Sequence, residues 1–226
     1  MSDFYSIAID GPSGAGKSTI ARSAAAHFGF LYVDTGAIYR TVGLGAQWAG
    51  LDSKDAAGVI AMLPALSIEM RYDDAGVQRM FLNGQDVSAE IRTPKSSIYA
   101  SDVSALTEVR AYLMDMQRDM AKKYSVIMDG RDIGTVVLPD AQVKIFLTAS
   151  SEARARRRCL ELEQKGMKTP FEEVLRDIEY RDEQDSSRAA APLKAADDAV
   201  VVDSTELDFD ATVEAVCRLI DAELEA

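Results

Sequence analysis

The sequence predicts an α/β fold, with a five-stranded parallel sheet, helices on both of its faces and a small antiparallel insert. Short apolar runs alternate with longer segments of helical periodicity, which is typical of parallel strands joined by crossover helices. A complete phosphate-loop pattern follows the first apolar run. Residues 64–93 instead show the alternation of antiparallel strands, so they interrupt the parallel arrangement.

The phosphate-loop pattern lies between a strand predicted over Tyr5–Asp10 and a helix predicted over Thr19–Phe28. Gly11–Ser18 fits the template G-x-x-x-x-G-K-[ST] at every position. Glycines let backbone N–H groups approach phosphate oxygens, and the start of the following helix adds its positive dipole end. Lys17 would then reach the β- and γ-phosphates, and the Ser18 hydroxyl would ligate Mg²⁺. The alternative, an ordinary glycine-rich turn, is disfavoured because the whole motif and both flanking elements are present.

The next strand is predicted over Gly29–Asp34, and a cap signal at its end starts a helix that runs to about Trp48. In this helix Thr35 and Tyr39 are four residues apart and Arg40 adjoins them. A hydroxyl, a phenol and a guanidinium can therefore face one cleft. An N-cap followed by an ordinary amphipathic helix explains the same residues equally well at this point.

The antiparallel insert follows a helix predicted over Ser53–Leu63. Strands are predicted over Leu66–Tyr72 and Val77–Leu82, and the tight-turn dipeptide Asn83–Gly84 leads to a third short strand. The segment is long enough for a small sheet of its own, so it is interpreted as a subdomain over residues 64–93.

The chain then returns to alternating helices and strands. A helix is predicted from Pro94 to Lys123, with a break near Ser101 and Asp102. The remaining strands are predicted over Ser125–Met128, Val143–Leu147 and Val200–Val202. Asp129 follows the first of these, at the edge where a carboxylate can meet a nucleotide from the same side as the phosphate loop.

Arginines gather on two predicted helices of this acidic chain. The helix Ser151–Lys165 carries Arg154, Arg157 and Arg158 on one face, and the next helix carries Arg181, Asp185 and Arg188 on one face. Together with Arg131, these cations suit a site for two phosphorylated molecules. Solvated faces paired with neighbouring carboxylates, including an Arg181–Asp185 pair, remain the alternative.

Composition limits the classes of function. The 226 residues carry a formal charge of −12, which argues against binding nucleic acid or an anionic membrane surface. Cys159 and Cys217 lack the spacing of a disulfide framework or zinc site, and His27 is the one histidine, so a histidine-based triad is excluded. With no signal sequence before the first strand and no run that could span a bilayer, a cytoplasmic location is expected.

The motifs IDGPSGAGKST, DTGAIYR, DGRDIGTVV, KIFLTAS and YRDEQDSSR, followed by APL, run along nearly the whole chain. In these motifs and in its antiparallel insert, the chain resembles the cytidylate kinases, a family of P-loop nucleoside monophosphate (NMP) kinases. Many NTPases share the first motif, whereas the third and fifth are far more specific. The resemblance implies an NMP-kinase fold: one domain over residues 1–226, an NMP-binding subdomain over 64–93 and an arginine-rich lid over 152–170.

The resemblance also implies roles for matching residues. ATP would be bound by Gly11, Pro12, Ser13, Gly14, Ala15, Gly16, Lys17, Ser18, Thr19, Arg154, Arg157 and Arg158. CMP would be bound by Thr35, Tyr39, Arg40, Ser101, Arg110, Asp129, Arg131, Asp132, Arg181, Asp185 and Arg188, with Ser101, Arg110 and Asp132 reading the cytosine. Lys17, Asp129, Arg131, Arg157 and Arg188 would be catalytic, and Ser18 would ligate Mg²⁺ carried by ATP. Ala153 stands where the family often has glutamate, and Arg156 adds a charge to the lid.

The implied reaction is ATP + CMP giving ADP + CDP, with dCMP as a second acceptor, in pyrimidine nucleotide metabolism. The CMP phosphate is already largely dianionic near neutral pH, because its second pKa is about 6, and it needs no strong general base. The expected partners are therefore ATP, Mg²⁺ and CMP or dCMP, and the chain is expected to be a monomer. Two alternatives stay open: a related kinase acting on UMP, AMP or a small alcohol, and a nucleotide-dependent switch.

Overall fold

The computed structural model describes residues 4–164 and 166–225, and these residues form two compact units. The sheet unit contains the described residues up to Tyr32 and those from Tyr124 onward. The insert unit spans Val33–Lys123. The sequence predicts an antiparallel subdomain over residues 64–93. The insert unit contains this segment and also the helices before and after it.

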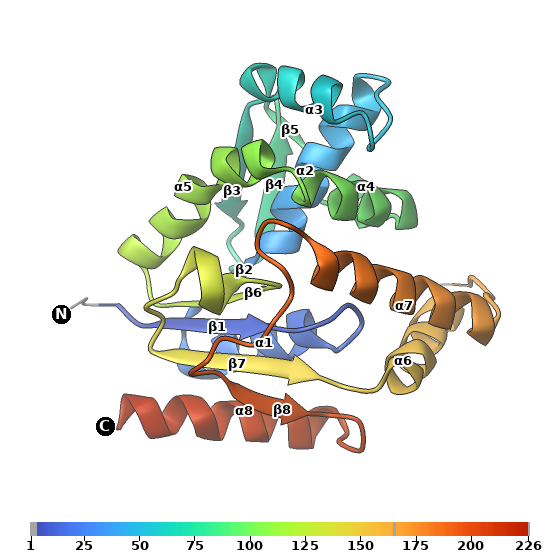
Figure 1. Ribbon diagram of the computed structural model, residues 1–226. Helices are drawn as coiled ribbons and strands as arrows, with labels where there is room; N and C mark the ends of the chain where they lie inside the picture. The colour runs from blue at the N-terminus through green and yellow to red at the C-terminus, as the bar shows by residue number, and fades with distance from the viewer. Residues whose placement is uncertain (1–3, 165, 226) are drawn as a thin grey trace. The chain divides into compact units, whose positions relative to one another are not determined.

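The sheet unit is built around a sheet whose strands follow the order β2-β6-β1-β7-β8 (Figure 1). These strands are β1 (Ser6–Asp10), β2 (Leu31–Asp34), β6 (Val126–Gly130), β7 (Val143–Thr148) and β8 (Val200–Asp203). β1 lies at the centre and pairs in parallel with β6 on one side and with β7 on the other. The prediction of five parallel strands is confirmed.

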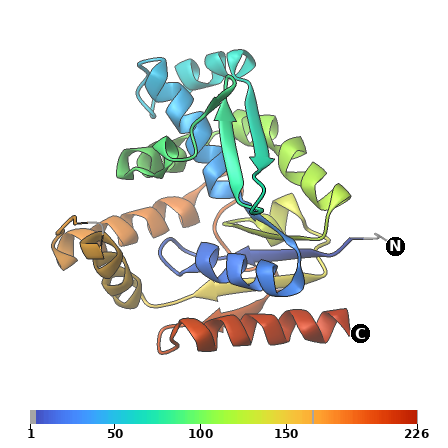
Figure 2. The ribbon, with the colours of Figure 1, turned by 180° about the vertical axis from the view of Figure 1, so that it is seen from behind.

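Branched aliphatic side chains form the core of the sheet unit. Ile7, Ile145 and Leu147 are at most 1% exposed. Helices α1 (Lys17–Phe28) and α8 (Phe209–Leu224) cover one face of the sheet, as Figure 2 shows for α1. Fully burying one such side chain stabilises the fold by about 1.5–3 kcal/mol. This packing holds the carboxyl ends of β1 and β6 in a fixed register.

Three further helical segments follow β6 and β7. A short π-helix, η3 (Ile133–Val137), comes directly after β6, where the sequence predicts no regular element. Helices α6 (Ser151–Gln164) and α7 (Phe171–Ser187) pack against each other. The buried apolar residues of their contact are Ala155, Leu162, Val174 and Ile178. Lys165, with which the sequence ends the first of these helices, lies outside the described residues.

The insert unit combines helices with a three-stranded sheet of order β3-β4-β5, in which β4 pairs antiparallel with both neighbours. Its strands are β3 (Ile68–Tyr72), β4 (Gln78–Leu82) and β5 (Gln85–Asp86). Its helices are α2 (Thr35–Trp48), α3 (Ala56–Met62), η1 (Leu63–Ala65), η2 (Glu90–Arg92), α4 (Pro94–Ser104) and α5 (Thr107–Lys123). Ile38, Leu82 and Leu113 are fully buried in the shared core of this unit.

A glycine lets two helices of the insert unit approach closely. A Cβ atom at Gly43 of α2 would lie 2.8 Å from the Cβ of Tyr99 on α4. Glycine inside a helix costs about 0.8–1 kcal/mol relative to alanine. The close helix contact explains why the sequence keeps glycine at this position.

Several element boundaries differ from the predictions for local reasons. Gly29 ends α1 in the left-handed conformation, with φ 66°, so β2 begins at Leu31 instead of Gly29. The Asp55 carboxylate accepts a hydrogen bond from Gly58 N and caps α3, which moves the predicted start at Ser53 to Ala56. The predicted break near Ser101 lies slightly later, between the end of α4 at Ser104 and the start of α5.

Candidate nucleotide site

The phosphate loop joins β1 to α1, and its glycines adopt conformations that other residues avoid. Gly11, Gly14 and Gly16 have φ values of 148°, 77° and 85°. A Cβ atom at Gly11 would lie 2.0 Å from the carbonyl oxygen of Leu147. Glycine is therefore required at Gly11 by space as well as by conformation.

Lys17 lies inside this loop and is 5% exposed. Its Nζ donates a hydrogen bond to the Pro12 carbonyl over 2.7 Å. Burial, followed by the positive charge of Arg131, lowers the pKa of Lys17 to about 7, although Asp129 and Asp10 oppose the shift. A phosphate group beside Lys17 would raise this pKa again, because a neighbouring anion favours the ammonium form.

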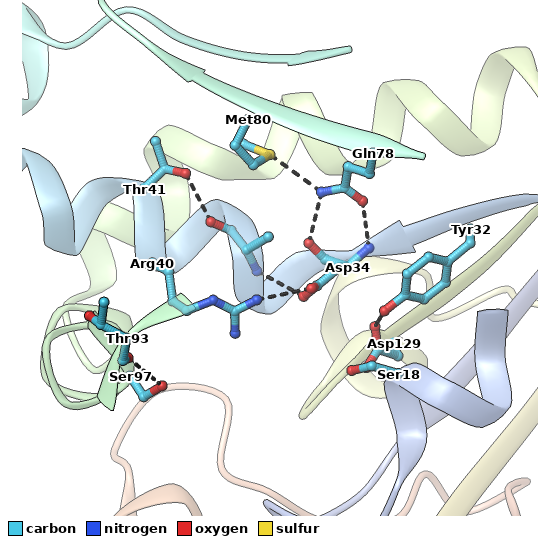
Figure 3. Close-up of polar contacts among 11 residues, drawn as sticks. Ser18, Tyr32, Asp34, Arg40, Thr41, Gln78, Met80, Thr93, Ser97 and Asp129 are labelled. Carbon is cyan, nitrogen blue, oxygen red and sulfur yellow. Dashed lines mark hydrogen bonds and ion pairs between the residues drawn. The ribbon is translucent and has the colours of Figure 1, made fainter. Parts of the chain in front are cut away.

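Asp129 lies near the end of β6, opposite Ile9 of β1, and both of its carboxylate oxygens accept hydrogen bonds. The Ser18 hydroxyl donates to Oδ2 over 2.8 Å, and the Tyr32 hydroxyl donates to Oδ1 over 2.9 Å (Figure 3). A hydroxyl and a carboxylate held together supply the hard oxygen atoms that Mg²⁺ prefers. The donor set therefore fits a magnesium ion carried by a nucleotide.

Asp185 of α7 holds two arginines, and we name this group the Asp185 cluster: Arg131, Asp185 and Arg188. Arg131 Nε donates to Asp185 Oδ2 over 2.7 Å, and Arg188 forms an ion pair with Oδ1. Burial alone would raise the pKa of Asp185, but the charges of Arg131 and Arg188 outweigh it and keep the pKa below its ordinary value. The carboxylate thus stays ionised and orients both guanidiniums.

The three arginines predicted to share a face of α6 contact different parts of the sheet unit. Arg154 is buried and donates to Ser13 O over 2.9 Å and to Ala149 O over 2.8 Å, and it pairs with Asp182. The three arginines share a helix, but their guanidiniums do not share a partner. Arg154 instead braces the backbone of the phosphate loop.

The other two arginines of α6 are held elsewhere. Arg157 donates to the carbonyl oxygens of Ser204 and Leu207, and Arg158 pairs with Glu161 one turn along the helix over 2.7 Å. The Arg158–Glu161 pair matches the alternative interpretation of this helix, a solvated face paired with neighbouring carboxylates. The helical spacing was right, but long side chains on one face reach partners in different directions.

In the insert unit, Asp34 organises the start of α2. Its carboxylate accepts hydrogen bonds from Ala37 N over 2.8 Å and from Arg40 Nη2 over 2.9 Å. Gln78 of β4 holds the Asp34 backbone in turn, through Asp34 N over 2.7 Å and Asp34 O over 3.1 Å (Figure 3). The Arg40 guanidinium is thereby fixed beside the N-terminus of its own helix.

The same unit contains four other predicted residues: Thr35, Tyr39, Ser101 and Arg110. The Arg110 guanidinium lies 5.7 Å from the centroid of the Tyr39 ring and donates to Ser104 O over 3.3 Å. Ser104 in turn donates to Ser101 O over 2.9 Å. Thr35 and Tyr39 are both buried on α2. Asp34 also forms the N-cap that the alternative interpretation of this helix expects, so nucleotide binding by Thr35 and Tyr39 stays a prediction.

The remaining predicted residues lie in the sheet unit. Asp132 is 4% exposed at the start of η3, and Arg181 is half-buried in α7. Thr19 is exposed on the first turn of α1. Sequence reasoning assigned no role to Asp10 or Tyr32. The Asp10 carboxylate accepts a hydrogen bond from Ile133 N of η3, and the Tyr32 hydroxyl donates to Asp129 of β6. For Asp10 the signal was a carboxylate at the end of an otherwise apolar strand.

Comparison with known proteins decides the family. A family model described as cytidylate kinase matches residues 7–222. The chain belongs to the cytidylate kinase family. It is 48% identical to a cytidylate kinase of Caldicellulosiruptor bescii over 94% of each chain. It is 46% identical to a cytidylate kinase of Lactobacillus johnsonii, over 95% of this chain and 93% of that protein.

Membership of the cytidylate kinase family confirms the resemblance found in the motifs and makes the chain a kinase.

A solved structure of an uncharacterized protein from Eubacterium ventriosum shares the fold, with a TM-score of 0.54 at 12% identity. That alignment covers 96% of this chain and 98% of the other. Among the described residues, no helix combines the length and the apolar character needed to cross a membrane.

Proposed function

We propose that this member of the cytidylate kinase family transfers the γ-phosphoryl group of ATP to CMP, and also to dCMP, giving ADP and CDP or dCDP. One observation supports the proposal: the sheet unit contains both a phosphate loop with a buried lysine, Lys17, and the arginines of the Asp185 cluster. A transferring phosphoryl group spreads negative charge over several oxygens, which such cations stabilise. We further propose a cytoplasmic role in pyrimidine nucleotide metabolism.

ATP would bind at the phosphate loop. Backbone N–H groups of residues 11–19 would surround the phosphates, and Lys17 would contact the β- and γ-phosphate oxygens. Mg²⁺ would neutralise part of the phosphate charge, with Ser18 and Asp129 as the residues that hold it. Arg154 supports this site from behind through Ser13 O. Arg157 and Arg158 would bind ATP after exchanging their present partners for phosphate oxygens.

CMP would be bound by the residues that the family resemblance assigns to it. We propose that Thr35, Tyr39, Arg40 and Arg131 hold its ribose and phosphate and that Arg181 and Asp185 contact the sugar. Arg188 would lie near the group in transfer. The CMP phosphate is largely dianionic at neutral pH, because its second pKa is about 6, so the attack requires positioning rather than a strong base.

Recognition of the base is assigned to Ser101, Arg110 and Asp132. The cytosine amino group is a donor where uracil has an acceptor, and a carboxylate such as Asp132 suits that donor. A buried polar set discriminates strongly, because the wrong base leaves its groups unpaired. Asp132→Ala is therefore expected to lower the preference for CMP over UMP, measured as the ratio of kcat/KM values.

The proposed function is tested by incubating the protein with ATP, Mg²⁺ and one acceptor at a time. CMP, dCMP, UMP, AMP and a small alcohol form the panel, and ADP release is followed in a coupled assay. We expect rapid ADP release with CMP and dCMP, and much slower release with the others. Faster turnover with AMP, UMP or the alcohol would assign another acceptor. Release that is independent of every acceptor would make the chain an ATPase.

A further inference from the structure

Asp10 is a buried carboxylate that the proposed reaction does not use. It is the last residue of β1, directly precedes Gly11 of the phosphate loop and is 4% exposed. Oδ1 accepts a hydrogen bond from Ile133 N over 2.8 Å, and Oδ2 accepts one from Gly134 N over 2.8 Å. Both oxygens of one strand residue therefore bind the backbone of a distant segment.

That segment is the beginning of the π-helix η3. The first N–H groups of a helix lack partners within the helix and are usually satisfied by the side chain of the capping residue. Here the capping residue is Asp132, whose side chain makes no capping hydrogen bond to η3 within the described part of the chain. Asp10 supplies this cap from the neighbouring strand.

The capped segment is also tightly packed. A Cβ atom at Gly134 would lie 3.2 Å from side-chain carbons of Lys144 and 3.5 Å from the Cβ of Ala8. The β1–β6 register places Asp10 opposite Gly130, four residues before Gly134. A small displacement of η3 would therefore move the intervening Arg131 and Asp132 with it.

Burial disfavours the ionised form of the Asp10 carboxyl group. Burial raises the pKa of Asp10 to about 6, and the two backbone hydrogen bonds to Gly134 and Ile133 oppose that shift. The nearby charge of Asp132 raises it further, and Lys17 lowers it. An apolar side chain would avoid this cost but could not bind the two N–H groups.

We infer that Asp10 is a positioning residue for the acceptor nucleotide: by capping η3, it fixes the backbone that carries Arg131 and Asp132. The inference rests on the proposed function, because it assigns Asp132 to the base. Asp10 also adjoins the phosphate loop through the peptide bond to Gly11. The Asp10 side chain thus connects the segment that carries Arg131 and Asp132 to the phosphate loop, which would hold ATP.

The test replaces Asp10 by asparagine, which has the same shape but turns one acceptor into an NH₂ donor facing a backbone N–H. We expect Asp10→Asn to raise the KM for CMP about tenfold and to lower the ratio of kcat/KM for CMP over UMP about tenfold. The KM for ATP should change less than twofold. In hydrogen exchange by NMR, the amides of Ile133 and Gly134 should exchange at least tenfold faster.

Asp208→Asn is the matched control, because the Asp208 carboxylate caps α8 through Ala211 N over 2.8 Å in the same unit. It should leave the CMP:UMP ratio and both KM values within twofold of wild type. If Asp10→Asn does not fold, Asp10→Ser, which keeps one acceptor without the opposing donor, is measured by the same readouts.

Two results would overturn the inference. An unchanged CMP:UMP ratio with accelerated exchange of Ile133 and Gly134 would make Asp10 a structural cap alone. Unchanged exchange at both amides would show that Asp10 does not hold η3. Failure of the proposed function is distinguishable from either result, because the wild-type protein would then fail to phosphorylate CMP while its amide exchange still reported the cap.

Discussion

At the scale of single residues, the candidate site consists of charged groups whose positions are fixed by hydrogen bonds from elsewhere in the chain. Tyr32 and Ser18 hold Asp129, and Asp185 holds Arg131 and Arg188. Lys17 differs, because its charge is disfavoured by burial and by Arg131. A phosphate loop without its nucleotide is therefore expected to be a destabilised part of the fold.

Lys17→Met tests this expectation. The variant should lose phosphoryl transfer and yet be more stable than wild type by about 1–3 kcal/mol at pH 7 without nucleotide, since an apolar side chain removes the buried charge. Above about pH 7 the unfolded lysine, with its ordinary pKa of 10.5, binds a proton that the folded one lacks. Wild type therefore gains stability as pH rises, and the advantage of the variant should shrink toward pH 10.

Urea unfolding at pH 6, 7, 9 and 10 measures the difference. Lys122→Met is the control, because Lys122 lies on the surface in an exposed ion pair with Asp119. That pair should contribute under about 1 kcal/mol at every pH. A Lys17→Met variant less stable than wild type at pH 7 would contradict the argument.

Tyr32→Phe tests the support of Asp129. Loss of one hydroxyl should cost about 1 kcal/mol of stability. Mutation of a residue that orients a metal-binding carboxylate typically lowers metal affinity by about tenfold or more. We therefore expect the Mg²⁺ concentration that gives half-maximal tightening of ATP binding to rise roughly tenfold, measured by fluorescence titration.

Tyr99→Phe provides the comparison, because the Tyr99 hydroxyl donates to Leu51 O over 3.1 Å inside the insert unit. It should cost similar stability and leave the Mg²⁺ dependence unchanged. Equal Mg²⁺ dependence in wild type and Tyr32→Phe would remove Tyr32 from the support of the metal site.

At the scale of elements, α6 connects to the phosphate loop through one buried arginine. Arg154 binds the backbone at Ser13 and Ala149 and pairs with Asp182 of α7, so it joins the loop to the α6–α7 pair. The helical period correctly placed Arg154, Arg157 and Arg158 on one face. It could not show that each guanidinium would reach a different partner, because the partners of Arg154 and Arg157 lie far away in sequence.

Arg154→Ala is expected to lower stability by about 2–3 kcal/mol, because two carbonyl oxygens and the Asp182 carboxylate lose a buried partner. Displacement of the loop backbone should weaken ATP binding roughly tenfold, as measured by calorimetry. Arg158→Ala removes an exposed pair and should change stability by no more than about 0.5 kcal/mol. Equal stability losses in the two variants would show that Arg154 does not brace the loop.

At the scale of the whole molecule, the sequence predicts what local pattern controls and misses what distant contacts control. Gly11–Ser18 locates the phosphate loop because its template combines glycines, lysine and a hydroxyl between a strand and a helix. The extent of the insert unit, from Val33 to Lys123, was missed because it depends on how flanking helices share a core with the antiparallel sheet. The bond from Arg131 to Asp185 likewise joins residues 54 positions apart.

We propose that the chain is a monomer. Sedimentation equilibrium at micromolar concentration should then give a mass near 24.6 kDa, with and without ATP and CMP. A mass near twice that value in either condition would reject the monomer.

The most direct test of the central claim follows the transferred group itself. ATP labelled with ¹⁸O on its γ-phosphoryl oxygens is mixed with CMP, Mg²⁺ and the protein, and the products are analysed by ³¹P NMR. Direct transfer predicts CDP whose β-phosphorus carries three labelled oxygens, together with ADP in equal amount. Labelled inorganic phosphate in place of labelled CDP would contradict the proposal.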